Sequence, residues 1–147
     1  MKISLGGITD NKHNKYFRIE GRLAIMNISK FTQKSVQAVQ DLEKVAYEYG
    51  NQEIEQEHLL YTLLTQEDSL ILKLIEKMEI NKEYFLNTVK NALDAKVKVS
   101  GGELRFGQYL NKALVNAEDE AKAMGDEYVS VEHLFLALLK YPSPSMK

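Results

Sequence analysis

Two histidines are the first candidates for chemistry, because each directly follows a glutamate: Glu57 precedes His58 and Glu132 precedes His133. A histidine beside a carboxylate can work in acid–base catalysis, and histidines one helical turn apart can bind a metal ion. Residues 26–147 contain no further histidine at a spacing such as H-E-x-x-H. We therefore expect a structural imidazole in each segment, and glutamates that compensate the dipole of a helix N-terminus.

A glycine-rich stretch at residues 101–107 is the second candidate, since such loops can bind phosphate groups. It lacks the Lys-Ser/Thr pair of a P-loop, and no hydrophobic strand precedes it. The chain also has no cysteine and no nucleophile elbow. The sequence predicts a chain that performs no catalysis and binds no cofactor itself.

The composition narrows the classes of partner. The chain has 147 residues, with 19 Lys and Arg against 21 Asp and Glu, giving a net charge of -2. This balance provides no long-range attraction for nucleic acid or anionic lipid. No apolar run approaches the roughly 18 residues that a membrane span needs. We expect a cytoplasmic protein that binds neither nucleic acid nor membrane.

Residues 1–25 differ from the rest of the chain. They contain scattered basic residues and two adjacent glycines, but no apolar core of a signal peptide. Residues 19–22 (IEGR) resemble the recognition sequence of a protease that removes fusion tags. We interpret residues 1–25 as a tag or a spurious extension; the alternative is a short native strand or arm.

The elements that must position these residues occur twice. Residues 31–64 and 106–139 align without a gap at a constant offset of 75 residues. Unrelated segments of this length would share about two or three residues by chance. A duplicated structural unit follows, since the identical pairs are Phe31/Phe106, Gln33/Gln108, Ala38/Ala113, Glu43/Glu118, Ala46/Ala121, Gly50/Gly125, Glu57/Glu132, His58/His133, Leu59/Leu134, Leu63/Leu138 and Leu64/Leu139.

Each unit is expected to contain four helices. In the first copy, Thr32 can cap a helix that runs to about Tyr49 and ends at Gly50, and a short second helix covers residues 57–64. Asp68 or Ser69 can cap a third helix, and Asn81 can cap a fourth. Ile54 is expected to plug the turn between the first two helices.

The second copy is expected to be incomplete. Residues 26–94 form repeat 1, residues 95–105 an irregular, hinge-like linker, and residues 106–147 a repeat 2 that lacks its last two helices. The missing helices would leave apolar surface exposed, which suggests a fragment of a longer polypeptide. The alternative is a naturally shorter copy, with Pro142 and Pro144 marking its true end.

With these duplicated units in view, the chain resembles the Clp N-terminal domain family, and the ClpB type more than the ClpA or ClpC types. The resemblance covers residues 26–147 and rests on residues 51–64 (NQEIEQEHLLYTLL), 126–139 (DEYVSVEHLFLALL), 30–33 (KFTQ) and 98–102 (KVSGG). It implies an all-α fold with two repeats in a pseudo-two-fold arrangement, the second truncated. It also implies an accessory domain of an ATP-driven hexameric disaggregase, whose ATP and magnesium sites would lie in modules C-terminal to Lys147.

The resemblance further implies partners and binding residues. The expected partners are unfolded or aggregated polypeptides, with a DnaK-type chaperone system acting through the full-length homo-hexamer. The positions that match the surface motif of the family are Thr32, Asp126 and Glu132, and the expected apolar rim is Leu114, Tyr128 and Val129. Two alternatives are an adaptor-docking domain of a Clp protease ATPase and a free-standing helical protein with a small-molecule pocket.

Overall fold

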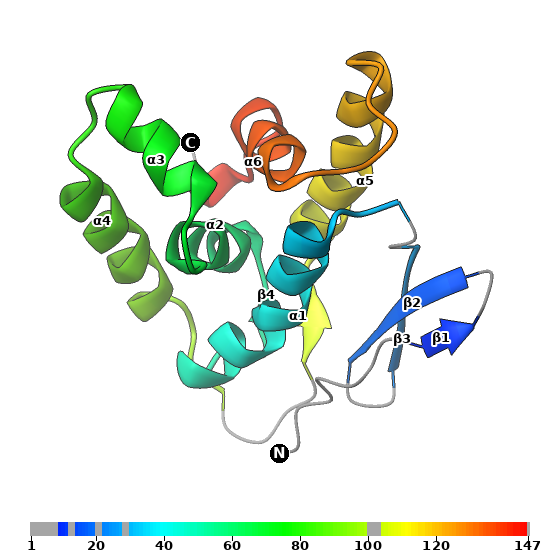
Figure 1. Cartoon of the computed structure of the whole chain (residues 1–147). Coiled ribbons are helices and arrows are strands. Elements are labelled where there is room, and N and C mark those ends of the chain that lie inside the picture. The colour runs from blue at the N-terminus through cyan, green and yellow to red at the C-terminus, as the bar shows by residue number, and fades with distance from the viewer. Residues whose placement is uncertain (1–8, 12–13, 20–21, 28–29, 100–103, 147) are drawn as a thin grey trace.

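The computed structural model describes residues 30–99 and 104–146, together with the backbone of three short strands before them. Within these residues, six α-helices form the body of the molecule (Figure 1). The all-α fold class predicted from the sequence is confirmed for this body.

An antiparallel sheet in the order β1-β2-β3 precedes the helices. Its strands are β1 (Thr9–Asn11), β2 (Asn14–Ile19) and β3 (Arg22–Asn27). Strand β3 therefore crosses the boundary expected between residues 25 and 26. Residues 20 and 21 of the stretch that resembles a protease recognition sequence lie outside the described residues. The interpretation of residues 1–25 as a tag stays a prediction.

Helix α1 (Gln33–Glu48) has the ends that the sequence predicts. The Thr32 hydroxyl accepts a hydrogen bond from the backbone amide of Ser35 at 3.3 Å, which makes it the N-cap. Gly50 has a φ of 69°, in the left-handed region that favours glycine after a helix C-terminus. One face of the helix enters the core through Ala38, Val39, Leu42 and Ala46.

Repeat 1 continues with strand β4 (Glu53–Ile54) and helices α2 (Gln56–Thr65), α3 (Leu70–Lys77) and α4 (Lys82–Asp94). The four predicted helices are confirmed.

The caps of the last two helices also follow the sequence. The Ser69 side chain accepts from the amide of Leu72 at 3.1 Å, so Ser69 caps α3 and Asp68 does not. The Asn81 side chain accepts from the amide of Tyr84 at 3.1 Å and caps α4. Local polar side chains thus set both helix starts.

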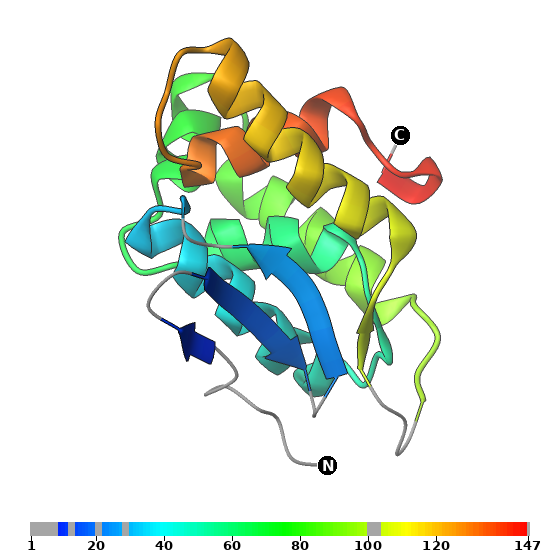
Figure 2. The ribbon, with the colours of Figure 1, turned by 90° about the vertical axis from the view of Figure 1, so that its right-hand side faces the viewer.

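Repeat 2 comprises strand β5 (Arg105–Phe106), helix α5 (Gln108–Ala123), helix α6 (Val131–Lys140) and a 3-10 turn η1 (Pro144–Met146). Helices α5 and α6 pack against each other, and α6 also contacts α1, α2 and α3 (Figures 1 and 2). The second repeat is shorter than the first by two helices within the described residues, as predicted.

The two repeats exchange equivalent contacts along their seam. Phe31 pairs with Val129 in a parallel bridge, and Phe106 pairs with Ile54 where β4 and β5 run parallel (Figure 1). In the sequence alignment Phe106 corresponds to Phe31 and Val129 to Ile54. Each repeat therefore pairs the backbone of its opening phenylalanine with that of the apolar turn residue of the other. This reciprocity confirms the pseudo-two-fold arrangement.

The described ends of the segment between the repeats are hydrogen-bonded to repeat 1. The amide of Val99 donates to the carbonyl of Gly50 at 2.9 Å, and the amide of Arg105 donates to the carbonyl of Gln52 at 3.1 Å. Leu104 is buried, and Arg105 belongs to β5. Residues 97–99 are irregular, as predicted, but both described ends of the segment are fixed to the turn between α1 and α2. The glycine pair 101–102, on which the hinge was predicted, lies outside the described residues, so the hinge stays a prediction.

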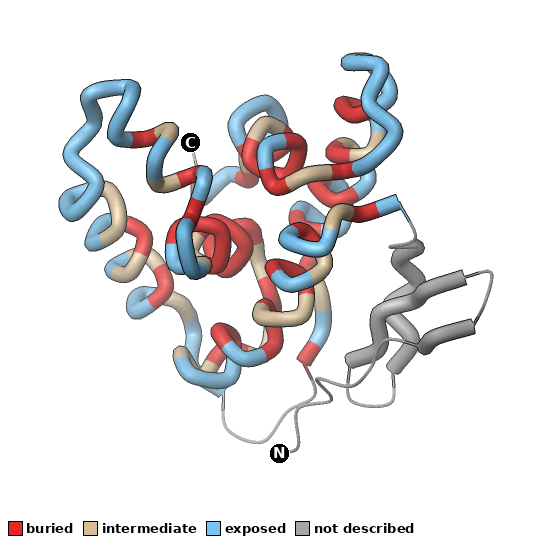
Figure 3. Tube along the Cα trace, in the orientation of Figure 1, coloured by how far each residue is buried: buried red, intermediate tan, exposed pale blue. Residues whose placement is uncertain are grey.

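The two repeats differ in how far the C-terminal ends of α2 and α6 are buried. Leu64 is 2% exposed, whereas its equivalent Leu139 is 59% exposed. Helices α3 and α4 contact α2 in repeat 1, whereas in the described part of repeat 2 the turn η1 follows α6 (Figure 3). The prediction that the shorter repeat leaves apolar surface exposed is confirmed at Leu139.

Candidate functional site

Each histidine of the repeats closes the turn in front of its helix. The backbone amide of Glu55 donates to Nδ1 of His58 at 2.9 Å, and the amide of Ser130 donates to Nδ1 of His133 at 2.9 Å. These bonds satisfy an amide that would otherwise lack a partner at a helix start. Because Nδ1 accepts a hydrogen in both rings, we assign the ring hydrogen to Nε2.

The Nε2 atoms bind the preceding turn. Nε2 of His58 donates to Oδ1 of Asn51 at 3.0 Å, and Nε2 of His133 donates to Oδ2 of Asp126 at 2.8 Å. Asn51 and Asp126 are equivalent positions of the two repeats. Each histidine therefore links its helix to the turn before it, which confirms the structural role predicted from the duplication.

Burial sets the protonation of His58. Its side chain is fully buried, and burial lowers the pKa of His58 to about 4, with a further lowering by the nearby Lys96 ammonium. The neutral ring is therefore the stable form at neutral pH. A neutral ring is also the form that accepts the Glu55 amide.

Glu57 and Glu132 both lie in the first turn of a helix, as predicted, but their surroundings differ. Glu132 is exposed, whereas Glu57 is 4% exposed and pairs with Lys96 at 3.3 Å. Burial alone would raise the pKa of Glu57. The hydrogen bond from Ser145, a backbone hydrogen bond and Lys96 outweigh that effect and lower it. Glu57 is thus a buried carboxylate that its neighbours keep ionised.

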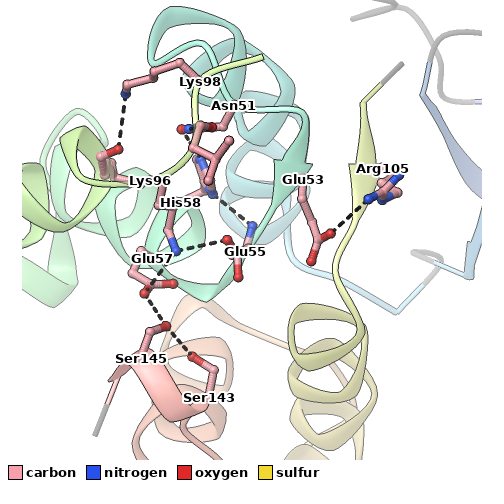
Figure 4. Close-up of polar contacts among 12 residues, drawn as sticks. Asn51, Glu53, Glu55, Glu57, His58, Lys96, Lys98, Arg105, Ser143 and Ser145 are labelled. Atoms are coloured by element: carbon pink, nitrogen blue, oxygen red, sulfur yellow. Dashed lines mark hydrogen bonds and ion pairs between the residues drawn. The ribbon is translucent and has the colours of Figure 1, made fainter. Parts of the chain in front are cut away.

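The C-terminal segment covers this part of repeat 1. The hydroxyl of Ser145 donates to Oε2 of Glu57 at 2.6 Å, and Ser143 lies beside it (Figure 4). The side chain of Gln56 accepts from the amide of Ser143 at 2.8 Å and donates to the carbonyl of Tyr141 at 3.0 Å. The side-chain amide of Gln56 therefore binds the backbone of the segment at two residues, Tyr141 and Ser143.

Replacing Gln56 by alanine is expected to lower the free energy of unfolding by about 1–3 kcal/mol, because it leaves the buried amide of Ser143 without its acceptor. Urea unfolding measures the change. Gln37→Ala is the matched control, since the exposed Gln37 bonds only Asp41 on its own helix and should lose about 0.5 kcal/mol or less. Equal losses in the two variants would show that the C-terminal segment is not held by Gln56.

The structure places four of the expected binding residues at or near the surface. Thr32 is half-buried, and its amide donates to the carbonyl of Val129 at 2.9 Å. Asp126, Tyr128 and Glu132 are exposed, and Tyr128 has 51% of its surface exposed. Three of these positions lie within seven residues of one another along the turn before α6 and its first residues. Their role in binding stays a prediction.

The expected apolar rim is wrong for two residues. Leu114 and Val129 are each 3% exposed, so neither offers an accessible surface. Leu114 lies on the buried face of α5, and Val129 is covered because it pairs with Phe31 across the seam. Tyr128 remains the exposed member of the expected rim.

Two pockets share three equivalent positions of the two repeats. A pocket of about 410 Å³ in repeat 1 is lined by Asn51, Gln52 and Arg105 among other residues. A pocket of about 250 Å³ in repeat 2 is lined by their equivalents Asp126, Glu127 and Lys30. All six of these side chains are charged or polar. The two surface pockets therefore differ in charge at two of the three positions that they share.

The described residues offer little for other chemistry. Among them, no group of three His, Cys, Asp or Glu side chains is arranged to bind a metal ion. Of the helices described, none has the length and apolar character needed to cross a bilayer.

Sequence reasoning missed the polar cluster on repeat 1. Gln56, Lys96 and Ser145 come from three separate segments, and Lys96 makes ion pairs with Glu55 at 3.0 Å and Glu57 at 3.3 Å. None of these residues belongs to a helical pattern shared with the others. Only the neighbouring Glu57 gave a signal in the sequence.

Comparison with known proteins identifies the family. The family model of the Clp repeat (R) N-terminal domain matches residues 30–145. A chaperone protein ClpB of Nitratidesulfovibrio vulgaris is 38% identical over 126 residues, which cover 82% of this chain and 15% of that protein. The chain thus spans about 15% of the length of this relative.

Solved structures have the same fold. The Hsp104 N-terminal domain from Candida albicans has a TM-score of 0.70 at 21% identity, covering 77% of this chain and 75% of that one. A complex of a ClpV N-domain with a VipB peptide has a TM-score of 0.64 at 20% identity, covering 80% and 75%. Together with the matched family model and the two reciprocal repeats, these similarities show that the chain belongs to the Clp N-terminal domain family.

Proposed function

We propose that this chain is the substrate-engaging N-terminal domain of a ClpB-like, ATP-dependent protein disaggregase, and that it binds unfolded or aggregated polypeptide. The observation that carries the proposal is the 38% identity to a ClpB chaperone over 126 residues. The solved complex of a ClpV N-domain with a VipB peptide supports polypeptide binding by this fold.

The larger assembly follows from the same proposal. ATP and magnesium would bind modules outside this chain, in a cytoplasmic homo-hexamer that works with a DnaK-type chaperone system. The domain itself would contribute binding without catalysis. Its task would be to hold a segment of polypeptide near the ring and then release it.

The surface of repeat 2 suits weak binding with little sequence preference. Tyr128 presents an aromatic ring with a polar tip, and the exposed carboxylates of Asp126 and Glu132 lie close to it in the sequence. The backbone beside Tyr128 is fixed, because the amide of Val129 donates to the carbonyl of Lys30 at 2.7 Å. A rigid turn with one exposed ring binds unfolded segments without a deep pocket, and so it releases them readily.

Binding of a permanently unfolded protein tests the proposal. We expect fluorescence anisotropy to show saturable binding of labelled, reduced and carboxymethylated lactalbumin, and no binding of the native form. Tyr128→Ala should weaken binding about fivefold, the scale of one aromatic contact. Tyr84→Ala is the matched control, because the Tyr84 ring on α4 is also exposed and should leave the affinity unchanged.

Indifference between native and unfolded lactalbumin would contradict the proposal. Selective binding of a folded protein would instead favour the alternative function, an adaptor-docking domain of a Clp protease ATPase.

A further inference from the structure

Repeat 1 carries an extended segment of its own chain across the end of α1. The amide of Val99 donates to the carbonyl of Gly50 at 2.9 Å. The side-chain amide of Asn51 donates to the carbonyl of Val97 at 3.1 Å. The glycine turn after α1 is therefore an occupied docking site for extended backbone.

A lysine anchors the segment at this site. Nζ of Lys98 donates to the carbonyls of Tyr49 at 2.6 Å and Leu93 at 3.3 Å, and it lies 5.5 Å from the centre of the Tyr49 ring. The C-terminal carbonyls of a helix carry partial negative charge, which favours an ammonium group there. The lysine side chain and the extended backbone of the segment thus bind the same turn.

The equivalent turn of repeat 2 carries no such segment among the residues that the structure describes. Gly125 has a φ of 72°, close to the 69° of Gly50, so the backbone shape is repeated. A Cβ placed on Gly50 would lie 3.6 Å from Cδ of Lys98, whereas a Cβ on Gly125 would have no atom within 4 Å. Within the described part of the chain, no hydrogen bond to the Gly125 carbonyl occurs. The turn has the same shape without the covering segment.

The charges around this turn favour a basic ligand. The 250 Å³ pocket beside it is lined by three acids, Glu118, Asp126 and Glu127, against Lys30 and Lys122. Asp126 replaces the Asn51 of repeat 1, so its side chain can accept hydrogen bonds but cannot donate them. One oxygen binds His133 and the carboxylate is half exposed. The substitution changes the preference from a carbonyl to an N–H or ammonium group.

We propose that the turn formed by Met124, Gly125 and Asp126 docks an extended, lysine-containing segment of a separate polypeptide, which keeps the glycine-carbonyl and lysine contacts that residues 97–99 make in repeat 1 but not the carbonyl contact to Asn51. The inference rests on the proposed function and gives it a location and a preferred ligand chemistry. The backbone of the ligand donates to the carbonyl of Gly125, and its ammonium group binds the end of α5 and the acids of the pocket.

A peptide with the sequence of residues 95–99 can test the proposed site. We expect the acetylated and amidated peptide AKVKV, the sequence of residues 95–99, to shift the backbone amide resonances of Met124, Gly125 and Asp126 in a titration of the ¹⁵N-labelled protein. The amides of Gly50 and Asn51 should stay unchanged, because their site is already occupied. The peptide AEVEV, with both lysines replaced, should bind at least about fivefold more weakly.

Charge reversal supplies matched variants. Glu127→Lys places an ammonium group in the pocket and should weaken AKVKV binding about fivefold or more. Glu83→Lys makes the same reversal on α4 and should have no effect. The inference is overturned if the resonances at 124–126 do not move at about 5 mM peptide, if AEVEV binds equally well, or if the two variants behave alike. Binding of unfolded lactalbumin without these shifts would leave the proposed function standing and remove only this site.

Discussion

Replacing Leu64 by alanine is expected to lower the free energy of unfolding by about 3 kcal/mol, whereas Leu139→Ala should lower it by less than about 0.5 kcal/mol. The two leucines are equivalent in the duplicated sequence, and the same atoms are removed in both variants. The difference arises because Leu64 is 2% exposed and Leu139 is 59% exposed. Urea unfolding at neutral pH measures both changes.

The neighbouring pair provides the control. Leu63 and Leu138 are both buried, so Leu63→Ala and Leu138→Ala should each cost about 2–5 kcal/mol. Similar losses at this pair would show that both repeats belong to one cooperative core. A loss at Leu139 as large as that at Leu64 would contradict the exposure of the shorter repeat, since only a covered side chain loses that much packing.

The parts of the fold that the sequence predicts are local or duplicated. Thr32, Ser69 and Asn81 cap the helices that follow them because a short polar side chain needs only a neighbouring amide. The gapless register predicts that His58 and His133 have the same role, and their Nδ1 and Nε2 bonds match. Local chemistry and repetition are both visible in a sequence.

The parts that could not be predicted depend on contacts between distant residues. Gln56 binds Ser143 across 87 positions of sequence, and no helical period connects them. Arg105 joins a strand because residues 52–54 offer backbone partners. Val129 was expected on an apolar rim, but its pairing with Phe31 buries it. The local sequence around an apolar turn residue is the same whether a distant strand covers that residue or not.

Acidification should destabilise the protein through His58. The pKa of this ring is about 4 in the folded protein, against an ordinary value of about 6.5 in the unfolded chain. Between these values the unfolded state binds more protons, so the free energy of unfolding decreases as the pH falls. The stabilising effect is fully present above about pH 6.5 and is lost as the pH falls towards 4. The full difference corresponds to about 3 kcal/mol.

The contribution of His58 can be separated from that of the carboxylates by a variant that cannot titrate at this position. Between pH 7.5 and about pH 5, His58 should account for a loss of about 2 kcal/mol in urea unfolding experiments. His58→Asn should lower stability at pH 7.5, because the ring hydrogen bonds are lost, but should remove this part of the pH dependence. His133→Asn keeps His58 and should keep the loss due to it. Equal slopes in the wild type and His58→Asn would mean that the ring has the same pKa in the folded and the unfolded chain, which the burial of the ring opposes.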